Sequence, residues 1–269
     1  MKEINVDELK KIQIEILDYV SDFCKKNNIN YWIDSGTLLG AVRHKGYIPW
    51  DDDIDIGMLR DDYEKFMSLF NKNNKSNYVF DCFELNKKCP YPYGKILDTN
   101  TIMYEPDEKT GIKSSVFIDL FPYDNIPEDE KIQKKLFKKR DLYKKLSNLQ
   151  KYSGFYIEEK NKFNFIRYPF HLLMKFFPNG FFVKKRIENA KLYNSQSTSI
   201  VGNLTGNMKQ ICSKDVFNEF IELEFEGKKY TAPSGYDKWL TSFYGNYMKL
   251  PPKEKQVSHH RFVAYLNSK

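Results

Sequence analysis

Four aspartates fall within five positions, Asp51–Asp55, of a chain of 269 residues whose formal net charge is +7. Carboxylates about 4 Å apart repel each other by about 4 kcal/mol at an effective dielectric constant near 20, so such a group needs a cation or full solvation. Asp53 and Asp55 alternate with isoleucines, which predicts a strand whose acids share one face and whose isoleucines face the core. Two carboxylates presented side by side suit a hard divalent cation such as Mg²⁺, with Mn²⁺ as the alternative.

Two other interpretations of this segment compete with a metal site. A calcium-binding EF-hand loop would require glycine at its sixth position and glutamate at its twelfth, where this chain has Ile56 and Asp62. A solvated acidic turn would not require the strict alternation of acidic and apolar residues. The pattern therefore favours a carboxylate pair, Asp53 and Asp55, that holds a divalent ion for phosphoryl transfer.

Asp119 is a candidate third acid, because it lies in a separate β-rich segment between Ile118 and Leu120. A carboxylate there could complete the metal shell or accept the proton of an attacking hydroxyl group. Taken alone, this residue is more simply interpreted as an edge-strand or capping aspartate. The acidic pair and an upstream glycine turn shift the balance towards the catalytic interpretation.

That glycine turn is the segment DSGTLLG, residues 34–40. Gly36 and Gly40 would let the backbone approach a phosphate closely, and the start of the next predicted helix offers free N–H groups. Ser35 and Thr37 add hydroxyl groups. We therefore predict that Ser35, Gly36 and Thr37 contact phosphate.

The elements that must position these residues follow from apolar periodicity and β-rich runs. Helices are predicted at residues 6–27, 37–43, 61–73 and 127–150, and strands at residues 29–36, 53–58, 93–101 and 114–124, the last with a proline stop at Pro122. The C-terminal part predicts short strands, turns and one helix. The implied class is α/β (α+β), with a small mixed sheet core and appended helices.

Composition shifts divide the chain into three parts. Residues 1–150 are predicted to form the catalytic core with an N-terminal helix, and residues 196–269 to complete it. Between them, residues 151–195 are predicted to be a helical insertion or subdomain, because aromatic and basic residues interleave from 155 to 187 and two prolines break the pattern.

The gross composition excludes several classes of protein. With 41% hydrophobic and 16% aromatic residues the chain is globular. It has neither a signal-peptide pattern nor an apolar run of about 20 residues, so we expect a cytoplasmic protein without a membrane span. The positive charge is scattered and lacks an RNA-binding signature, which argues against nucleic acid as a partner. The four cysteines contain no CxxC pair and are predicted to remain thiols without structural zinc; they are Cys24, Cys82, Cys89 and Cys212.

The order of glycine turn, DxD strand and third-aspartate strand resembles that of the nucleotidyltransferase superfamily. A closer resemblance is to the LicD family of phosphocholine and related CDP-alcohol phosphotransferases, which includes the fukutin-related proteins. The segments that carry it are YWIDSGTLLGAVRHKGYIPWDDDIDIGM, YGKILDTNT, FIDLFPYD and FEGKKYTAPSGYDKWLTSFYGNYMKLPP, with His259 or His260 beyond them. The cysteine cluster that binds zinc in fukutin-related protein has no counterpart in this sequence.

This resemblance implies a nucleotidyltransferase-like fold and a phosphotransferase activity. The expected reaction transfers a phospho-alcohol, with phosphocholine from CDP-choline favoured, to a sugar hydroxyl of a cell-surface glycan precursor such as teichoic acid or capsule, and releases CMP. By resemblance, Asp53 and Asp55 match the metal-binding pair with Asp51 beside them, and Asp119 matches the third acid. On this mechanism Arg43, His44 and Lys95 are predicted to contact phosphate oxygens, although each could equally be a structural or solvated side chain.

The implied partners are a CDP-alcohol donor and a lipid-linked glycan acceptor at the inner face of the plasma membrane. Residues 155–187 could make a peripheral membrane contact there, or form a helical pair that covers the core. The aromatic candidates for holding a choline ammonium group are Trp50, Tyr91, Tyr93, Tyr104 and Tyr123. The competing functions are transfer of glycerol or ribitol phosphate, a nucleotidyltransferase that releases pyrophosphate, and a catalytically silent scaffold.

Overall fold

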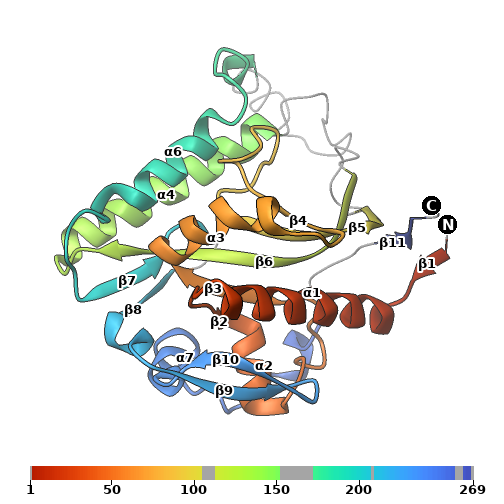
Figure 1. The fold of residues 1–269 in the computed structure, drawn as a ribbon. Helices are drawn as coiled ribbons and strands as arrows, with labels where there is room; N and C mark the ends of the chain where they lie inside the picture. The colour runs from red at the N-terminus through yellow and green to blue at the C-terminus, as the bar shows by residue number, and fades with distance from the viewer. Residues whose placement is uncertain (1, 105–112, 152–171, 207–208, 258–262, 268–269) are drawn as a thin grey trace.

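The computed structural model describes residues 2–104, 113–151, 172–206, 209–257 and 263–267 (Figure 1). Within these ranges, nine strands form one mixed sheet, with the order β1-β11-β5-β6-β3-β2 and with β4 beside β5, β7 beside β6 and β8 beside β7. A separate two-stranded sheet contains β9 and β10. The mixed α/β class predicted from the sequence is confirmed.

The bounds of the elements are as follows. The helices are α1 (Val6–Lys26), α2 (Ser35–His44), α3 (Arg60–Asn73), α4 (Glu130–Lys151), α6 (Phe181–Ala190) and α7 (Tyr236–Tyr244), with short 3-10 turns η1 (Lys191–Tyr193), η2 (Lys214–Phe217) and η3 (Lys253–Lys255). The strands are β1 (Lys2–Ile4), β2 (Trp32–Ile33), β3 (Asp55–Leu59), β4 (Tyr78–Asp81), β5 (Gly94–Tyr104), β6 (Lys113–Ile126), β7 (Ile200–Asn203), β8 (Gln210–Ser213), β9 (Phe220–Phe225), β10 (Lys228–Pro233) and β11 (Val263–Leu266).

The N-terminal helix α1 is held by a capping box, in which the Asn5 side chain accepts from Glu8 N–H and the Glu8 side chain accepts from Asn5 N–H. Its buried face packs against β5 and β6. β2 and β3 pair antiparallel, and β3 pairs parallel with β6. The helix predicted at residues 6–27 and the strand predicted at residues 53–58 are therefore confirmed, apart from one or two residues at their ends.

Three structural features differ from the sequence prediction or go beyond it. The strand predicted at residues 29–36 is reduced to β2, Trp32–Ile33, and Ser35 and Gly36, predicted in a glycine turn, are the first residues of α2. β6 does not stop at Pro122 but continues to Ile126. Pairing between β5 and β6 ends at Leu120 and pairing between β7 and β6 begins at Asp124, so the proline, which lacks an N–H, lies where neither β5 nor β7 pairs with β6. In addition, β11 inserts between β1 and β5, a long-range pairing that the sequence pattern did not predict.

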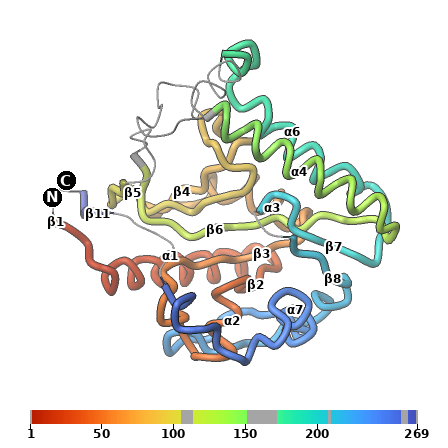
Figure 2. Tube along the Cα trace, turned by 180° about the vertical axis from the view of Figure 1, so that it is seen from behind, coloured from red at the N-terminus to blue at the C-terminus, as the bar shows by residue number. Residues whose placement is uncertain are grey.

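The helical region after β6 is only partly described. Of the predicted insertion, residues 152–171 lie outside the described ranges. α6 packs along α4 (Figure 2), and both contribute to an apolar cluster that also contains Ile126 of β6. The division of the chain at residues 150 and 195 stays a prediction. No helix in the described ranges has the length and apolar character that a membrane span requires. The four cysteines are buried free thiols.

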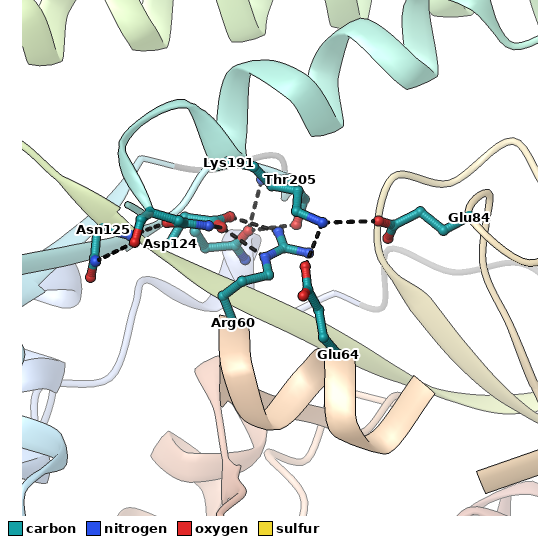
Figure 3. A network of polar contacts seen from close by, with 9 residues as sticks. Arg60, Glu64, Glu84, Asp124, Asn125, Lys191 and Thr205 are labelled. Carbon is teal, nitrogen blue, oxygen red and sulfur yellow. Dashed lines mark hydrogen bonds and ion pairs between the residues drawn. The ribbon is translucent and has the colours of Figure 1, made fainter. Parts of the chain in front are cut away.

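A buried ion pair joins the end of β3 to the end of β6. Arg60 donates from Nε and Nη2 to the two carboxylate oxygens of Asp124 at 2.7 and 2.8 Å, and Asn194 donates to the same carboxylate at 2.6 Å (Figure 3). The Arg60 and Asp124 side chains are 6% and 0% exposed. Nearby, Lys191 forms ion pairs with Glu64 and Glu84.

We predict that Arg60→Met lowers the free energy of unfolding by about 3 to 5 kcal/mol, because it leaves the Asp124 carboxylate buried without its partner. The double variant Arg60→Met/Asp124→Leu should cost less than the single one, since no charge is then buried. Urea denaturation measures both. As a control, Lys238 and Asp215 form an exposed pair, 59% and 58% exposed, and Lys238→Met should cost about 1 kcal/mol or less. A loss for Arg60→Met as small as that of the control would contradict the prediction.

Candidate active site

A large open cleft lies where the acidic segment before β3 meets α2, β5, β6 and the segment after α7. Its volume is about 1350 Å³. The aspartates that line it are Asp51, Asp52, Asp53, Asp55 and Asp119. Other lining residues include Ser35, Gly36, Arg43, Trp50, Tyr91, Tyr93 and Lys95. The cleft therefore contains most of the residues that the sequence predicts to contact metal or phosphate.

Strand pairing places two of the acids side by side. β3 and β6 pair with Asp55 opposite Asp119, and Asp119 N–H donates to the carbonyl of Ile54 at 2.9 Å. Ile54 is fully buried, as is Ile56. Asp53 and Asp55, in contrast, are partly exposed in the cleft. The predicted division of this segment into an acidic face and an apolar face is confirmed.

The start of α2 lies against the acidic segment. A side chain at Gly36 would clash, because a Cβ atom there would lie 2.7 Å from Oδ2 of Asp51. Ser35 has a positive φ of 48°, and its Oγ accepts from Nε2 of Gln210 at 2.9 Å. Thr37 is buried outside the cleft lining, and its Oγ1 accepts from Asp55 N–H at 2.8 Å. Ser35 and Gly36 thus face the cleft, whereas the Thr37 hydroxyl fixes the acidic strand.

Lys95 supplies positive charge beside Asp119. The two residues pair across β5 and β6, and Lys95 Nζ lies 2.8 Å from Oδ1 of Asp119. The ammonium group also faces aromatic rings, at 3.2 Å from the Phe117 centroid and 4.6 Å from that of Tyr91. It is therefore a buried cation held by one carboxylate and several ring faces. In this structure its contact is with Asp119, and a phosphate contact stays a prediction.

Arg43 and His44 differ in their relation to the cleft. Arg43 lines it, with Nη1 donating to the carbonyl of Tyr247 at 2.8 Å and Nε donating to Nε2 of His44 at 2.9 Å. His44 does not line the cleft and makes an edge contact with Trp50. Burial lowers the pKa of the His44 imidazole, with the Arg43 charge as a smaller cause.

Comparison with known proteins decides the family. Residues 28–180 match a family profile described as the LicD/FKTN/FKRP nucleotidyltransferase domain. The chain is 33% identical over 271 residues to the lipopolysaccharide cholinephosphotransferase LicD of Haemophilus influenzae, an alignment that spans 99% of this chain and 100% of that protein. The chain belongs to the LicD family.

Shorter similarities link this LicD-family chain to human proteins. It is 42% identical over 48 residues to ribitol 5-phosphate transferase FKRP, which is 18% of this chain and 10% of that protein. It is 25% identical over 108 residues to ribitol-5-phosphate transferase FKTN, covering 40% of this chain and 21% of that protein. The family predicted from the sequence is confirmed, and the chain is a LicD-type phosphotransferase.

Several residues that support the LicD-family cleft were missed by the sequence analysis. Asp34, at the end of β2, is fully buried and accepts from the hydroxyl of Tyr123 and from Nε1 of Trp239 at 3.1 Å. Burial raises the pKa of the Asp34 carboxyl group. Gln210 and Trp239 both lie outside residues 28–180, and no local sequence signal connects them to the glycine turn.

The aromatic candidates divide into two groups. Trp50, Tyr91 and Tyr93 line the cleft. Tyr104 does not line it and contacts Tyr265, while Tyr123 is buried behind the cleft and bound to Asp34. His259 and His260 lie outside the described residues.

The cleft fits a hard divalent cation in charge and in donor type, because its aspartates offer only carboxylate oxygens. The repulsion among them is evident at Asp55, where burial and then Asp53, Asp119, Asp34 and Asp51 raise the pKa of the carboxyl group well above its ordinary value of 3.8. In the described ranges, no three histidine, cysteine or acidic side chains already lie close enough together to hold a metal ion. A metal site here would need side-chain rearrangement, including at the Lys95 contact with Asp119.

The raised pKa of Asp55 predicts how stability depends on pH in the absence of metal. Ionised Asp55 destabilises the folded state. This loss of folding free energy is absent well below pH 4, grows as the pH rises through the pKa of Asp55 in the unfolded state, and is complete above its pKa in the folded state. Asp55→Asn removes this loss. The variant should therefore be more stable than the wild type at pH 7, with the difference shrinking towards pH 4.

Urea denaturation in EDTA over this pH range measures the difference. Asp22 is an exposed acid on α1, and Asp22→Asn should stay within about 0.5 kcal/mol of the wild type. A lower stability of Asp55→Asn at pH 7 would contradict the prediction.

Proposed function

We propose that this LicD-family enzyme transfers phosphocholine from CDP-choline to a sugar hydroxyl of a cell-surface glycan precursor, such as teichoic acid or capsule, and releases CMP. The observation that carries this proposal is that one cleft is lined both by clustered aspartates and by aromatic rings. The acids suit a divalent ion bound to a diphosphate, and the rings suit a quaternary ammonium group. The full-length similarity to a protein named as a cholinephosphotransferase supports the same donor.

In this proposal Asp53 and Asp55 hold Mg²⁺, or Mn²⁺, with Asp51 beside them. When bound, the ion would neutralise charge on the diphosphate and on the departing CMP. Arg43 faces the cleft with a forked guanidinium group suited to phosphate oxygens. Gly36 has no side chain of its own, so the backbone at Ser35 and Gly36 can come close to the same phosphates, with the Asp51 carboxylate beside it.

Asp119 would accept the proton of the sugar hydroxyl. A bond then forms between the sugar oxygen and the phosphorus that carries choline, and the bond from that phosphorus to the bridging oxygen breaks, so that CMP leaves with the electron pair. Lys95 contacts one oxygen of the Asp119 carboxylate at 2.8 Å and would orient it. Positioning and charge neutralisation supply most of the catalysis in such a reaction.

The proposed acceptor is a lipid-linked glycan, which the enzyme would reach through peripheral contact with the inner face of the plasma membrane. Exposed apolar side chains in the described part of the predicted insertion support this contact. Phe176 is 85% exposed, close to the exposed Leu172 and Leu173 and next to Lys175. Such a mixture suits an anionic lipid surface. Flotation with anionic vesicles tests it, and absence of binding would remove the membrane contact.

We predict that Asp53→Asn lowers Mg²⁺-dependent CMP release from CDP-choline by roughly a thousandfold, because a metal ligand contributes several kcal/mol of transition-state stabilisation. Circular dichroism should show an unchanged fold. Product analysis also tests the rival reaction, since a nucleotidyltransferase acting on a nucleoside triphosphate would release pyrophosphate. Full activity of Asp53→Asn would overturn the metal-pair proposal, and Asp22→Asn is the matched acidic control.

We predict that Tyr91→Leu raises the KM for CDP-choline roughly fivefold, the effect of losing about 1 kcal/mol of cation–π attraction. The KM for CDP-ribitol, which carries no ammonium group, should change much less. Tyr104→Leu, outside the cleft lining, is the control. Equal effects of Tyr91→Leu on both donors would argue against a choline subsite at this wall, and a preference of the wild type for CDP-ribitol or CDP-glycerol would replace choline as the alcohol.

A further inference from the structure

The acidic segment before β3 has little regular backbone pairing. Residues 51–54 form neither helix nor strand. Asp51 N–H donates to the carbonyl of Ile48 at 2.8 Å, and the carbonyl of Ile54 accepts from Asp119 at 2.9 Å. The position of the residues between these two points therefore depends on side chains that reach them from other elements.

Gln13 of α1 is such a side chain. It is 4% exposed, lies on the buried face of the helix with Leu9 and Ile16, and lines the cleft. Its Nε2 donates to the carbonyl of Asp52 at 3.1 Å and to that of Phe117 at 3.3 Å. Its Oε1 accepts from the Tyr47 hydroxyl at 2.9 Å.

These contacts orient the amide group in one way. Both carbonyl groups can only accept, so the amide nitrogen must face them, and the Tyr47 hydroxyl faces the oxygen. An amide at a core-facing helix position costs free energy unless its hydrogen bonds are made. A leucine would pack there at a lower free-energy cost, because it needs no hydrogen-bond partners. The amide group of Gln13 is therefore explained by the hydrogen bonds that it makes.

The two carbonyl groups belong to the two acidic segments of the cleft. Asp52 directly precedes Asp53, and Phe117 lies two residues before Asp119 on β6. One side chain from α1 therefore spans the backbone of both segments. Gln13 also lies outside residues 28–180, the part of the chain that matches the family domain.

We propose that Gln13 is a positioning residue that sets the position of Asp53 relative to Asp55 and Asp119, and thereby the affinity of the cleft for a divalent ion. This inference rests on the metal site of the proposed function. Groups that orient metal ligands from behind typically change metal affinity by about 10- to 100-fold when they are removed.

The test measures Mn²⁺ binding by isothermal titration calorimetry, without substrate. Gln13→Met removes the polar group at similar size, and Gln13→Asn keeps the amide but lacks the reach to both carbonyl groups. Both should raise the Kd for Mn²⁺ by about 10-fold or more. Tyr47→Phe, which removes only the group that orients the amide, should raise it less.

The chain offers a matched control in Gln150 of α4. Gln150 is 9% exposed and also donates from Nε2 to two carbonyl groups, those of Phe177 at 3.2 Å and Pro178 at 2.7 Å. Gln150→Met should reduce the stability, measured by urea denaturation, and leave the Kd for Mn²⁺ unchanged. If Gln13→Met does not fold, Gln13→Asn and Tyr47→Phe decide the question.

The outcomes separate this inference from the proposed function. Wild-type affinity in the folded Gln13 variants, or an equal loss of affinity in Gln150→Met, would overturn the positioning role and leave the metal site standing. A wild-type protein that does not bind Mn²⁺ or Mg²⁺ would overturn the metal site itself, and the role of Gln13 with it.

Discussion

The central constraint on this structure is the repulsion among carboxylates that the fold brings to one place. β3 and β6 run in parallel and put Asp55 opposite Asp119, while Asp51 packs against Gly36 at the start of α2. Like charges held this close together in a partly buried cleft oppose folding. The surrounding structure must hold them against that force, and many of its contacts can be understood in this way.

The contacts that oppose the repulsion come from distant parts of the chain. Gln13 of α1 and Thr37 of α2 bind the backbone of the acidic segment. Gln210 and Trp239, in the C-terminal third, bind Ser35 and Asp34 at the start of α2. The Arg60 pair with Asp124 joins the residue that follows β3 to β6. The matched family domain, residues 28–180, therefore gives only part of the site, and flanking segments complete it.

Local sequence patterns allowed us to predict which residues form the acidic face and which form the apolar face of the segment around Asp53. The alternation around Asp53 has the period of a strand, so both its exposure and the burial of Ile54 followed from the sequence. The register between Asp55 and Asp119 did not, because it depends on pairing between segments far apart in the chain. The same reason explains why Asp34, whose partners Tyr123 and Trp239 are distant, was not recognised, and why Pro122 was mistaken for a strand end. The roles of the individual site residues remain predictions.

The contact between Lys95 and Asp119 bears on the charge balance of the cleft. The Lys95 ammonium group contacts the Asp119 carboxylate among aromatic rings and so acts as an internal counter-ion. Part of the negative charge is thus compensated by the chain itself rather than by anything acquired from solution. The cleft therefore carries less uncompensated negative charge than its aspartates alone would give it.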